Sequence, residues 1–492
     1  MMSRNTLSAD RGRWLVLAVV STALLLIVVD MTVLYTALPR LTHDLAVSAS
    51  AKLWILNVYG LVVAGLLPGM GTLGDRLGHK RMFMAGLAVF GAASLAAAYA
   101  PGAAALIAAR VLLALGAAMM MPATLSIIRL TFTDARERAM AIGVWASVAS
   151  GGAAVGPVLG GFLLEHFWWG SVFLVNVPIV LLALPLAWRF IPRGAGPGGA
   201  PWDLKGSLQV MAGLVLSAYA LKELGKPEPS LAAAAAAALA GLGMLWVFGR
   251  RQRRMAHPLI DFSLFRNRTF CSAVAAAIFA AAALLGMELV FTQRLQLVLD
   301  LSPLQAAVYL LPLPVAAFVS GPLAGWMLPR AGERRMLAGA LLLSGLGAGA
   351  YLLVYEGSLA AQVAALALMG LGIGATMTAA SSTIMQSAPA DRAGMAASIE
   401  EVSYELGGAL GVTLMGSLLS GVYARTLPGN LPAAARGSLD EALLAAGRLP
   451  AEAGRQWVAA AKEAFDMGFV AVMLAVTAIL VGSALLVVFN RR

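Results

Sequence analysis

The chain has 492 residues, of which 60% are hydrophobic and only 12% are charged, and its mean hydropathy is +0.84. Soluble domains carry about 25% charged residues, so this composition excludes an ordinary soluble protein. The net charge of +11 does not indicate a nucleic-acid partner, because the basic residues fall in short loops between apolar runs and form no continuous patch.

Apolar runs of about 20 residues recur along the chain, and each is long enough to cross a bilayer as a helix. The runs are continuous rather than alternating, so they predict helices and not the strands of a barrel. The first run is too long for the core of a signal peptide, and we expect it to remain as a span. We predict an all-α integral membrane protein with fourteen spans at approximately residues 14–38, 53–73, 82–99, 104–128, 139–164, 172–190, 205–225, 231–249, 270–293, 303–328, 334–354, 359–384, 396–421 and 467–489.

The distribution of Lys and Arg predicts how the chain is oriented. An even number of spans puts both termini on one side, and most of the 35 basic residues lie on that side. The strongest marker is the basic loop at residues 250–269, which begins RRQRR. Because short cytoplasmic loops accumulate Lys and Arg, we expect both termini, including residues 1–13, in the cytoplasm of a bacterium, with the chain in its inner membrane.

Two segments of the chain resemble each other. GTLGDRLGHKRM, residues 71–82, aligns with GWMLPRAGERRM, residues 325–336, and a shorter GGA match follows in each half. Repeated halves are typical of transporters, whose binding sites lie between them near the membrane midplane. We therefore predict a six-helix half over 14–190 and another over 270–489, with a linker and two extra helices inserted over 191–249.

The long loop at residues 422–466 predicts a small external helical hairpin. SLDE at 438–441 fits a capping box, and apolar residues then recur at helical spacing. We favour a lid packed on the membrane domain over a module that binds a partner.

Charged residues within spans are costly and are functional candidates by default. Asp30 lies about 24 Å from the cytoplasmic end of its span, and Arg110 lies about 27 Å from the same side, at 1.5 Å per residue. We predict that the two side chains pair in at least one state. Protonation of Asp30 would break the pair and switch conformation; the alternative is a static ion pair that fixes two helices.

The thirteenth predicted span carries three acidic residues. Glu401 and Glu405 are four residues apart and share one face, with Glu405 about 16 Å deep, whereas Glu400 is rotated away by about 100°. Such carboxylates can exchange protons or attract a cation; the alternative is a hydrogen-bond network between helices. The repeat places Trp145 where this span has Glu401, so the acids are specific to one half. Glu288, near an outer end, is either solvated or a vestibule acid.

The segment GTLGDRLGHKRM resembles the loop between spans 2 and 3 of the major facilitator superfamily. Its glycines allow a tight turn and close helix approach, and we expect Asp75 to accept hydrogen bonds from a neighbouring helix N-terminus. The matching residues are Gly71, Asp75, Arg76, Gly78, Lys80 and Arg81.

Three further segments resemble antiporters of this superfamily. GAAVGPVLGG matches the antiporter motif of span 5 through Gly152, Gly156, Pro157, Gly160 and Gly161. VDMTVLYTALPRL, which contains Asp30, resembles span 1 of the fourteen-helix drug:proton antiporters, the DHA2 family. LIAARVLLALGAA resembles their span 4 motif through Arg110, although Leu113 and Ala114 replace the usual Gln and Gly.

The resemblance covers nearly the whole chain and is greatest to the QacA/SmvA-like exporters. It implies a major facilitator fold with two six-helix halves plus two inserted helices. It also implies proton-coupled efflux of hydrophobic organic cations, such as quaternary ammonium compounds, viologens, dyes and biguanide-type biocides. We expect a monomer that needs no cofactor or metal beyond the proton gradient.

Organic cations bind between aromatic and soft apolar side chains. Candidate wall residues in the spans are Tyr35, Trp54, Tyr59, Met119, Trp145 and Tyr404. The alternative is a transporter of another substrate class, such as a metabolite or lipid mover. A membrane enzyme is not expected, because the sequence has no HExxH, Walker A or GxSxG motif, and its one cysteine, Cys271, excludes a thiolate metal cluster.

Overall fold

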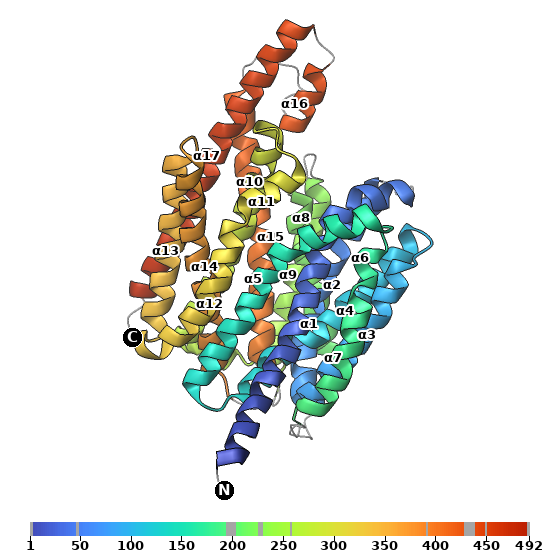
Figure 1. The fold of residues 1–492 in the computed structure, drawn as a ribbon, viewed down its shortest axis with the longest axis vertical. Helices are drawn as coiled ribbons and strands as arrows, with labels where there is room; N and C mark the ends of the chain where they lie inside the picture. The colour runs from blue at the N-terminus through green and yellow to red at the C-terminus, as the bar shows by residue number, and fades with distance from the viewer. Residues whose placement is uncertain are drawn as a thin grey trace.

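The computed structural model describes residues 3–45, 49–192, 203–224, 230–255, 258–389, 392–427, 438–447 and 450–489. Within these ranges the secondary structure is helical, and fourteen helices are long and apolar enough to cross a membrane (Figure 1). The predicted all-α class and number of spans are therefore confirmed. The protein is a multi-pass membrane protein.

The helices follow one another along the chain with short connections. Their bounds are α1 (Ser3–Asp44), α2 (Ala49–Leu77), α3 (His79–Ala98), α4 (Ala103–Thr131), α5 (Ala135–His166), α6 (Ser171–Leu174), α7 (Asn176–Phe190), α8 (Leu204–Leu224), α9 (Leu231–Gln252), η1 (Phe262–Arg266), α10 (Arg268–Gln293), η2 (Arg294–Val298), α11 (Pro303–Leu310), α12 (Pro312–Ala331), α13 (Glu333–Val354), α14 (Leu359–Ser387), α15 (Ala393–Thr426), α16 (Leu439–Ala446) and α17 (Ala451–Phe489).

Two predicted spans are each divided into two helices. The span predicted at 172–190 is formed by α6 and α7, and that at 303–328 by α11 and α12. Pro178 lies in the first turn of α7 and Pro312 is the first residue of α12. Proline fits a first turn but has no N–H to continue the preceding helix, so each break falls just before a proline.

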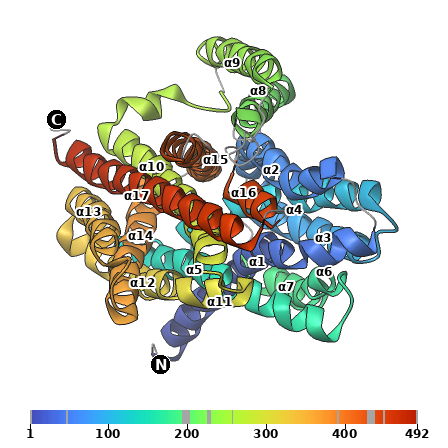
Figure 2. The same cartoon turned by 90° about the horizontal axis from the view of Figure 1, so that it is seen from above.

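In chain order α1–α7 make up the first half and α10–α17 the second, with α5 packed against α12 and α2 against α15. Helices α8 and α9 lie together at the edge of the bundle, on the side of α2 and α15 (Figure 2). Both termini lie at the same end of the molecule, and α16 lies at the opposite end (Figure 1). We call these ends the terminal face and the hairpin face.

The two halves are closed against each other near the terminal face. A Cβ on Gly71 of α2 would overlap the carbonyl oxygen of Gly394 at the start of α15. A Cβ on Gly143 of α5 would likewise overlap the carbonyl oxygen of Gly321 of α12, and Gly325 packs in the same way on Ala139. Only glycine allows backbones to approach so closely, so these residues permit the closed seam.

The predicted repeat is visible as the same contact in each half. Gly78 and Gly332 both have positive φ, 94° and 80°, where the chain turns into α3 and α13. Lys80 Nζ donates to the carbonyls of Trp188, at 2.7 Å, and Ile191, at 2.6 Å, at the end of α7. Arg334 donates to the carbonyls of Val487, at 3.0 Å, and Val488, at the end of α17. A cation after the turn thus caps the last helix of its own half.

A helical hairpin is present at the hairpin face, but its second arm is not a separate helix. α17 runs without a break from Ala451 through the last span to Phe489, and α16 packs against its outer part (Figure 1). Arg294 Nε of η2 donates to Asp466 Oδ1 at 2.7 Å, and Lys462 Nζ donates to Asp300 Oδ2 at 2.6 Å, so α17 is tied to the outer end of α10. Residues 428–437 lie outside the described ranges, and the lid role stays a prediction.

The antiporter motif provides a test of this packing. A Cβ on Gly156 would overlap Thr32 Oγ1 of α1, whereas a Cβ on Gly161 would have no atom within 4 Å. Substitution Gly156→Ala should lower the free energy of unfolding by about 1–3 kcal/mol through overpacking. Gly161→Ala is the matched control and should melt as the unsubstituted protein does in detergent. Equal melting temperatures for the two variants would contradict the predicted contact between α5 and α1.

Candidate functional site

The first half contains a buried ion pair, as predicted. Arg110 Nη1 of α4 donates to Asp30 Oδ2 of α1 at 2.8 Å, and the side chains are 2% and 0% exposed. Arg110 Nε also donates to the carbonyl of Ile55 in α2 at 3.4 Å. The Tyr59 ring lies 4.6 Å from the guanidinium carbon, close enough for a cation–π contact. The predicted pairing is present, whereas the role of Asp30 and Arg110 in transport stays a prediction.

Asn176 completes this site, and the sequence reasoning did not single it out. Its Nδ2 donates to Asp30 Oδ1 at 3.4 Å and to Ser94 Oγ of α3 at 3.2 Å. Asn176 is 1% exposed at the first turn of α7. The available signal was a lone amide within an apolar run, because a buried polar side chain needs partners.

The second half holds its acidic residues on α15. Glu400 is fully buried and accepts a hydrogen bond from Ser381 Oγ of α14, so it faces a neighbouring helix as its rotation predicts. Glu401 is 5% exposed, and its Oε1 has no hydrogen-bond partner among the described residues. Neither Glu400 nor Glu401 makes an ion pair with a described residue. Glu405 is half-buried on the same face as Glu401.

The two sites meet at α2. Glu405 Oε2 lies 3.8 Å from where a Cβ of Gly60 would be. Gly60 directly follows Tyr59, whose ring packs on Arg110. One turn of α2 therefore touches the ion pair of the first half and a carboxylate of the second.

The predicted wall residues differ in their surroundings. Tyr59 and Trp145 are buried, Met119 and Tyr404 are half-buried, and Trp54 is 47% exposed. The Trp145 indole N–H has no described hydrogen-bond partner. The side chain of Tyr35 lies outside the described residues. Glu288 is exposed on α10. Tyr59 lies on Arg110 rather than on an open wall, and contact of these residues with a substrate stays a prediction.

Asp75 makes the contact that the loop motif predicts. Its Oδ1 accepts the backbone N–H of Gly394 at 2.8 Å, and its Oδ2 accepts that of Met395 at 3.1 Å. A carboxylate at a helix N-terminus satisfies free N–H groups and interacts favourably with the helix dipole. Asp75 thereby holds α15 of the second half to α2 of the first at the terminal face.

Comparison with known proteins agrees with this geometry. Residues 20–412 match the family model described as Major Facilitator Superfamily. The chain is 42% identical over 462 residues to the methyl viologen resistance protein SmvA of Salmonella typhimurium, covering 92% of this chain and 93% of SmvA. It is 39% identical to the multidrug efflux pump LfrA of Mycolicibacterium smegmatis, covering 97% and 96%. The chain belongs to the major facilitator superfamily.

Solved structures confirm the fold of this major facilitator protein. It superposes on the human organic anion transporter MFSD10 with a TM-score of 0.64 at 16% identity, over 95% of this chain and 99% of that chain. The proton:xylose symporter XylE gives a TM-score of 0.63 at 14% identity, over 97% and 95%. At these identities the comparison concerns the fold alone. Members of this superfamily are transporters and not enzymes.

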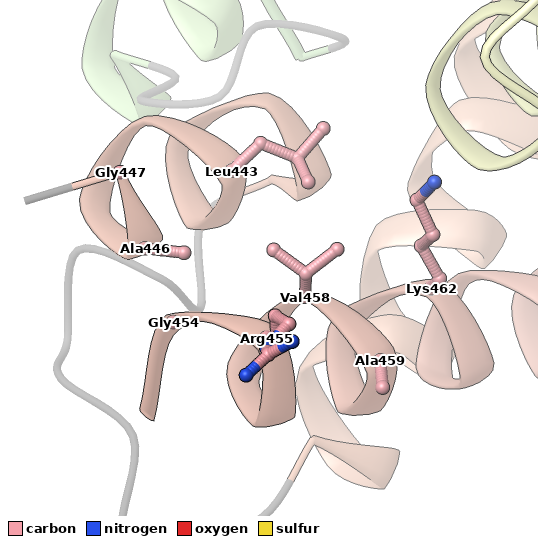
Figure 3. Close-up of a pocket in the computed structure, with 8 residues that line it drawn as sticks. All are labelled: Leu443, Ala446, Gly447, Gly454, Arg455, Val458, Ala459 and Lys462. Carbon is pink, nitrogen blue, oxygen red and sulfur yellow. The ribbon is translucent and has the colours of Figure 1, made fainter. Parts of the chain in front are cut away.

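A groove on the hairpin of this major facilitator protein is separate from the charged site. It has a volume of about 600 Å³ and lies between α16 and the outer part of α17, with Leu443 and Val458 on its two sides (Figure 3). None of its eight lining residues is acidic, and two of them are the cations Arg455 and Lys462. Each of these cations is paired with a carboxylate, Arg455 with Glu452 and Lys462 with Asp300.

The buried ion pair predicts how a single substitution affects stability. Arg110→Met leaves Asp30 in an apolar site without its cation, and it should lower stability by about 3–5 kcal/mol at neutral pH. The double variant Asp30→Asn/Arg110→Met removes both charges and should recover a large part of that loss. Melting in detergent measures both effects. If the single and double variants melted together, Asp30 would not depend on Arg110.

Proposed function

We propose that this transporter is a proton-coupled exporter of hydrophobic organic cations, acting as a monomer in a bacterial inner membrane with its terminal face in the cytoplasm. The observation that carries the proposal is the contrast between the two halves. Asp30 is buried against Arg110, whereas Glu401 is buried without a described cation. A carboxylate in such a place is stable when it is protonated or when a cation lies beside it.

A proton and an organic cation therefore compete for Glu401. A bound organic cation stabilises the ionised carboxylate, and a proton removes the charge that attracts the cation. Glu405 lies on the same helix face, next to Gly60 of α2. Its carboxylate can therefore bind the second charge of a dication or accept a second proton. When the two halves alternate between inward-open and outward-open states, this competition couples export of the drug to entry of a proton.

The Asp30–Arg110 pair fits a conformational switch in the same cycle. It is intact while the terminal face is closed. Protonation of Asp30 removes its attraction for Arg110 and changes the contacts with α2, which carries both Tyr59 and Gly60. We propose that this event shifts the balance between the two states of the transporter.

The printed names of the relatives support the substrate class. SmvA is a methyl viologen resistance protein, LfrA is a multidrug efflux pump, and a 36% identical relative from Streptomyces alboniger is a puromycin resistance protein. Charge supports the proposed orientation, because the basic residues at 250–255 and 258–268 lie where α9 ends and α10 begins, on the side where Asp261 meets the start of α15, and short basic loops stay in the cytoplasm.

Transport in inverted vesicles tests this function. When the vesicle lumen is acidic, addition of ethidium, a viologen or a bisbiguanide should release protons from the lumen as the cation enters. Glu401→Gln should reduce that proton release about tenfold or more, which corresponds to roughly 1.4 kcal/mol of coupling. Glu400→Gln and Glu405→Gln, assayed with monovalent and divalent cations, show whether the roles are divided.

The matched control is Glu452→Gln, which changes an exposed ion pair with Arg455 on the hairpin and should leave proton release unchanged. Absence of any substrate-induced proton movement across a broad panel of cations would contradict proton-coupled export. Full activity in all three α15 variants would return these acids to a structural role.

A further inference from the structure

The inserted helices α8 and α9 contact both halves of the transporter. On the first half, a Cβ on Gly65 of α2 would lie 2.8 Å from Met211 and 2.9 Å from Val215, both on α8. On the second half, Val402 and Leu406 of α15 pack against an apolar cluster formed by Val210, Leu214, Phe248 and Leu259. The insertion therefore lies across the seam that must open and close during transport.

A polar cluster joins the terminal-face ends of α8 and α9. Asp203 Oδ1 accepts the N–H of Gly206 in the first turn of α8 at 2.9 Å and accepts from Arg251 Nη2 at 2.6 Å. Gln252, which is 1% exposed, donates from Nε2 to Asp203 Oδ2 at 2.9 Å. Its Oε1 accepts the N–H of Leu259 at 2.6 Å. This last bond folds the loop that follows α9 back onto the inserted pair.

The same loop also contacts the start of α15. Asp261 receives a charge-assisted hydrogen bond from Arg392, the residue before α15, and its own N–H points at Met395 Sδ at 3.2 Å. The N–H of Met395 donates to Asp75 of α2. The first turn of α15 is thus held from two directions, by the α2 loop and by the loop of the insertion.

The carboxylate of Asp261 is well placed to stay ionised. Partial desolvation opposes its charge, but the hydrogen bonds from Ser263 and the nearby Arg392 guanidinium outweigh it and hold the pKa of Asp261 below its ordinary value. Its contact with Arg392 therefore persists across the neutral pH range. The Asp261–Arg392 contact differs from the proposed switch at Asp30, because it does not depend on binding of a proton.

We infer that residues Asp203, Gln252, Asp261 and Arg392 form a clip by which the inserted helices stabilise the state that is closed at the cytoplasmic face. Asp261 is the positioning residue that joins the clip to α15. The inference rests on the alternating halves of the proposed function but not on proton coupling or on any particular substrate. In this proposal the two inserted helices stabilise one conformational state of the transporter.

Distance measurement between spin labels tests the clip directly. Labels on Thr133 of the first half and Arg335 of the second, both exposed at the terminal face, report its opening in a Cys271→Ser background. Asp261→Arg places two like charges together and should raise the fraction of long distances about two- to fivefold, as expected for loss of a partly exposed ion pair. Gln252→Leu should act in the same direction through the folded-back loop. The exchange Asp261→Arg/Arg392→Asp should restore the original distribution.

Two controls keep the test decisive. Glu137→Ala breaks an ion pair with Arg13 at the same face but within one half, and it should leave the distances unchanged. Each variant is also tested for its melting temperature, so that a loss of folding is separated from a shift of state. Unchanged distances in folded Asp261→Arg, or failure of the charge exchange to reverse a shift, would overturn the clip. The measurement uses purified protein without substrate or gradient, so its outcome is independent of the vesicle assay.

Discussion

A charged side chain in the middle of a bilayer needs a partner, and in this transporter Arg110 and Asp30 provide one for each other. The pair has contacts from four helices of the first half: α1 and α4 supply the charges, α2 supplies Ile55 and Tyr59, and α7 supplies Asn176. Asn176 in turn binds Ser94 of α3. In the proposed switch, protonation of Asp30 changes the contacts that join these helices.

The second half also buries charged side chains, but it does not pair the two that lie on α15 with a described cation. Glu401 and Glu405 lie on α15 at positions where the repeat has Trp145 and Ala149, and the buried Glu400 and Glu401 make no ion pair with a described residue. The first half thus buries a carboxylate against a cation, whereas the second half buries Glu401 without a described ion-pair partner. The two sites are adjacent through consecutive residues of α2, so the chemistry of the acids and the geometry of the pair share one helix turn.

Much of this arrangement follows from local sequence. Long apolar runs predict the spans, and equal depth in the membrane predicts the Asp30–Arg110 pair. The position of Asp75 in the loop motif predicts its contact with a helix start. The Asn176 and Asp261 contacts were not predicted, because their partners lie 82 to 146 residues away and no motif or matched membrane depth points to them. The unbroken α17 was also missed, because its outer part has a polar, soluble-type pattern although its backbone continues the span.

The central claim is that protonation of Asp30 changes the balance between states. Amide hydrogen exchange at the terminal face, measured from acidic to alkaline pH in wild type and in Asp30→Asn, tests it without substrate. We expect protection of the α2 and α15 contact regions to fall in wild type as Asp30 is protonated, and to depend much less on pH in the variant. The same pH dependence in both proteins would contradict the account.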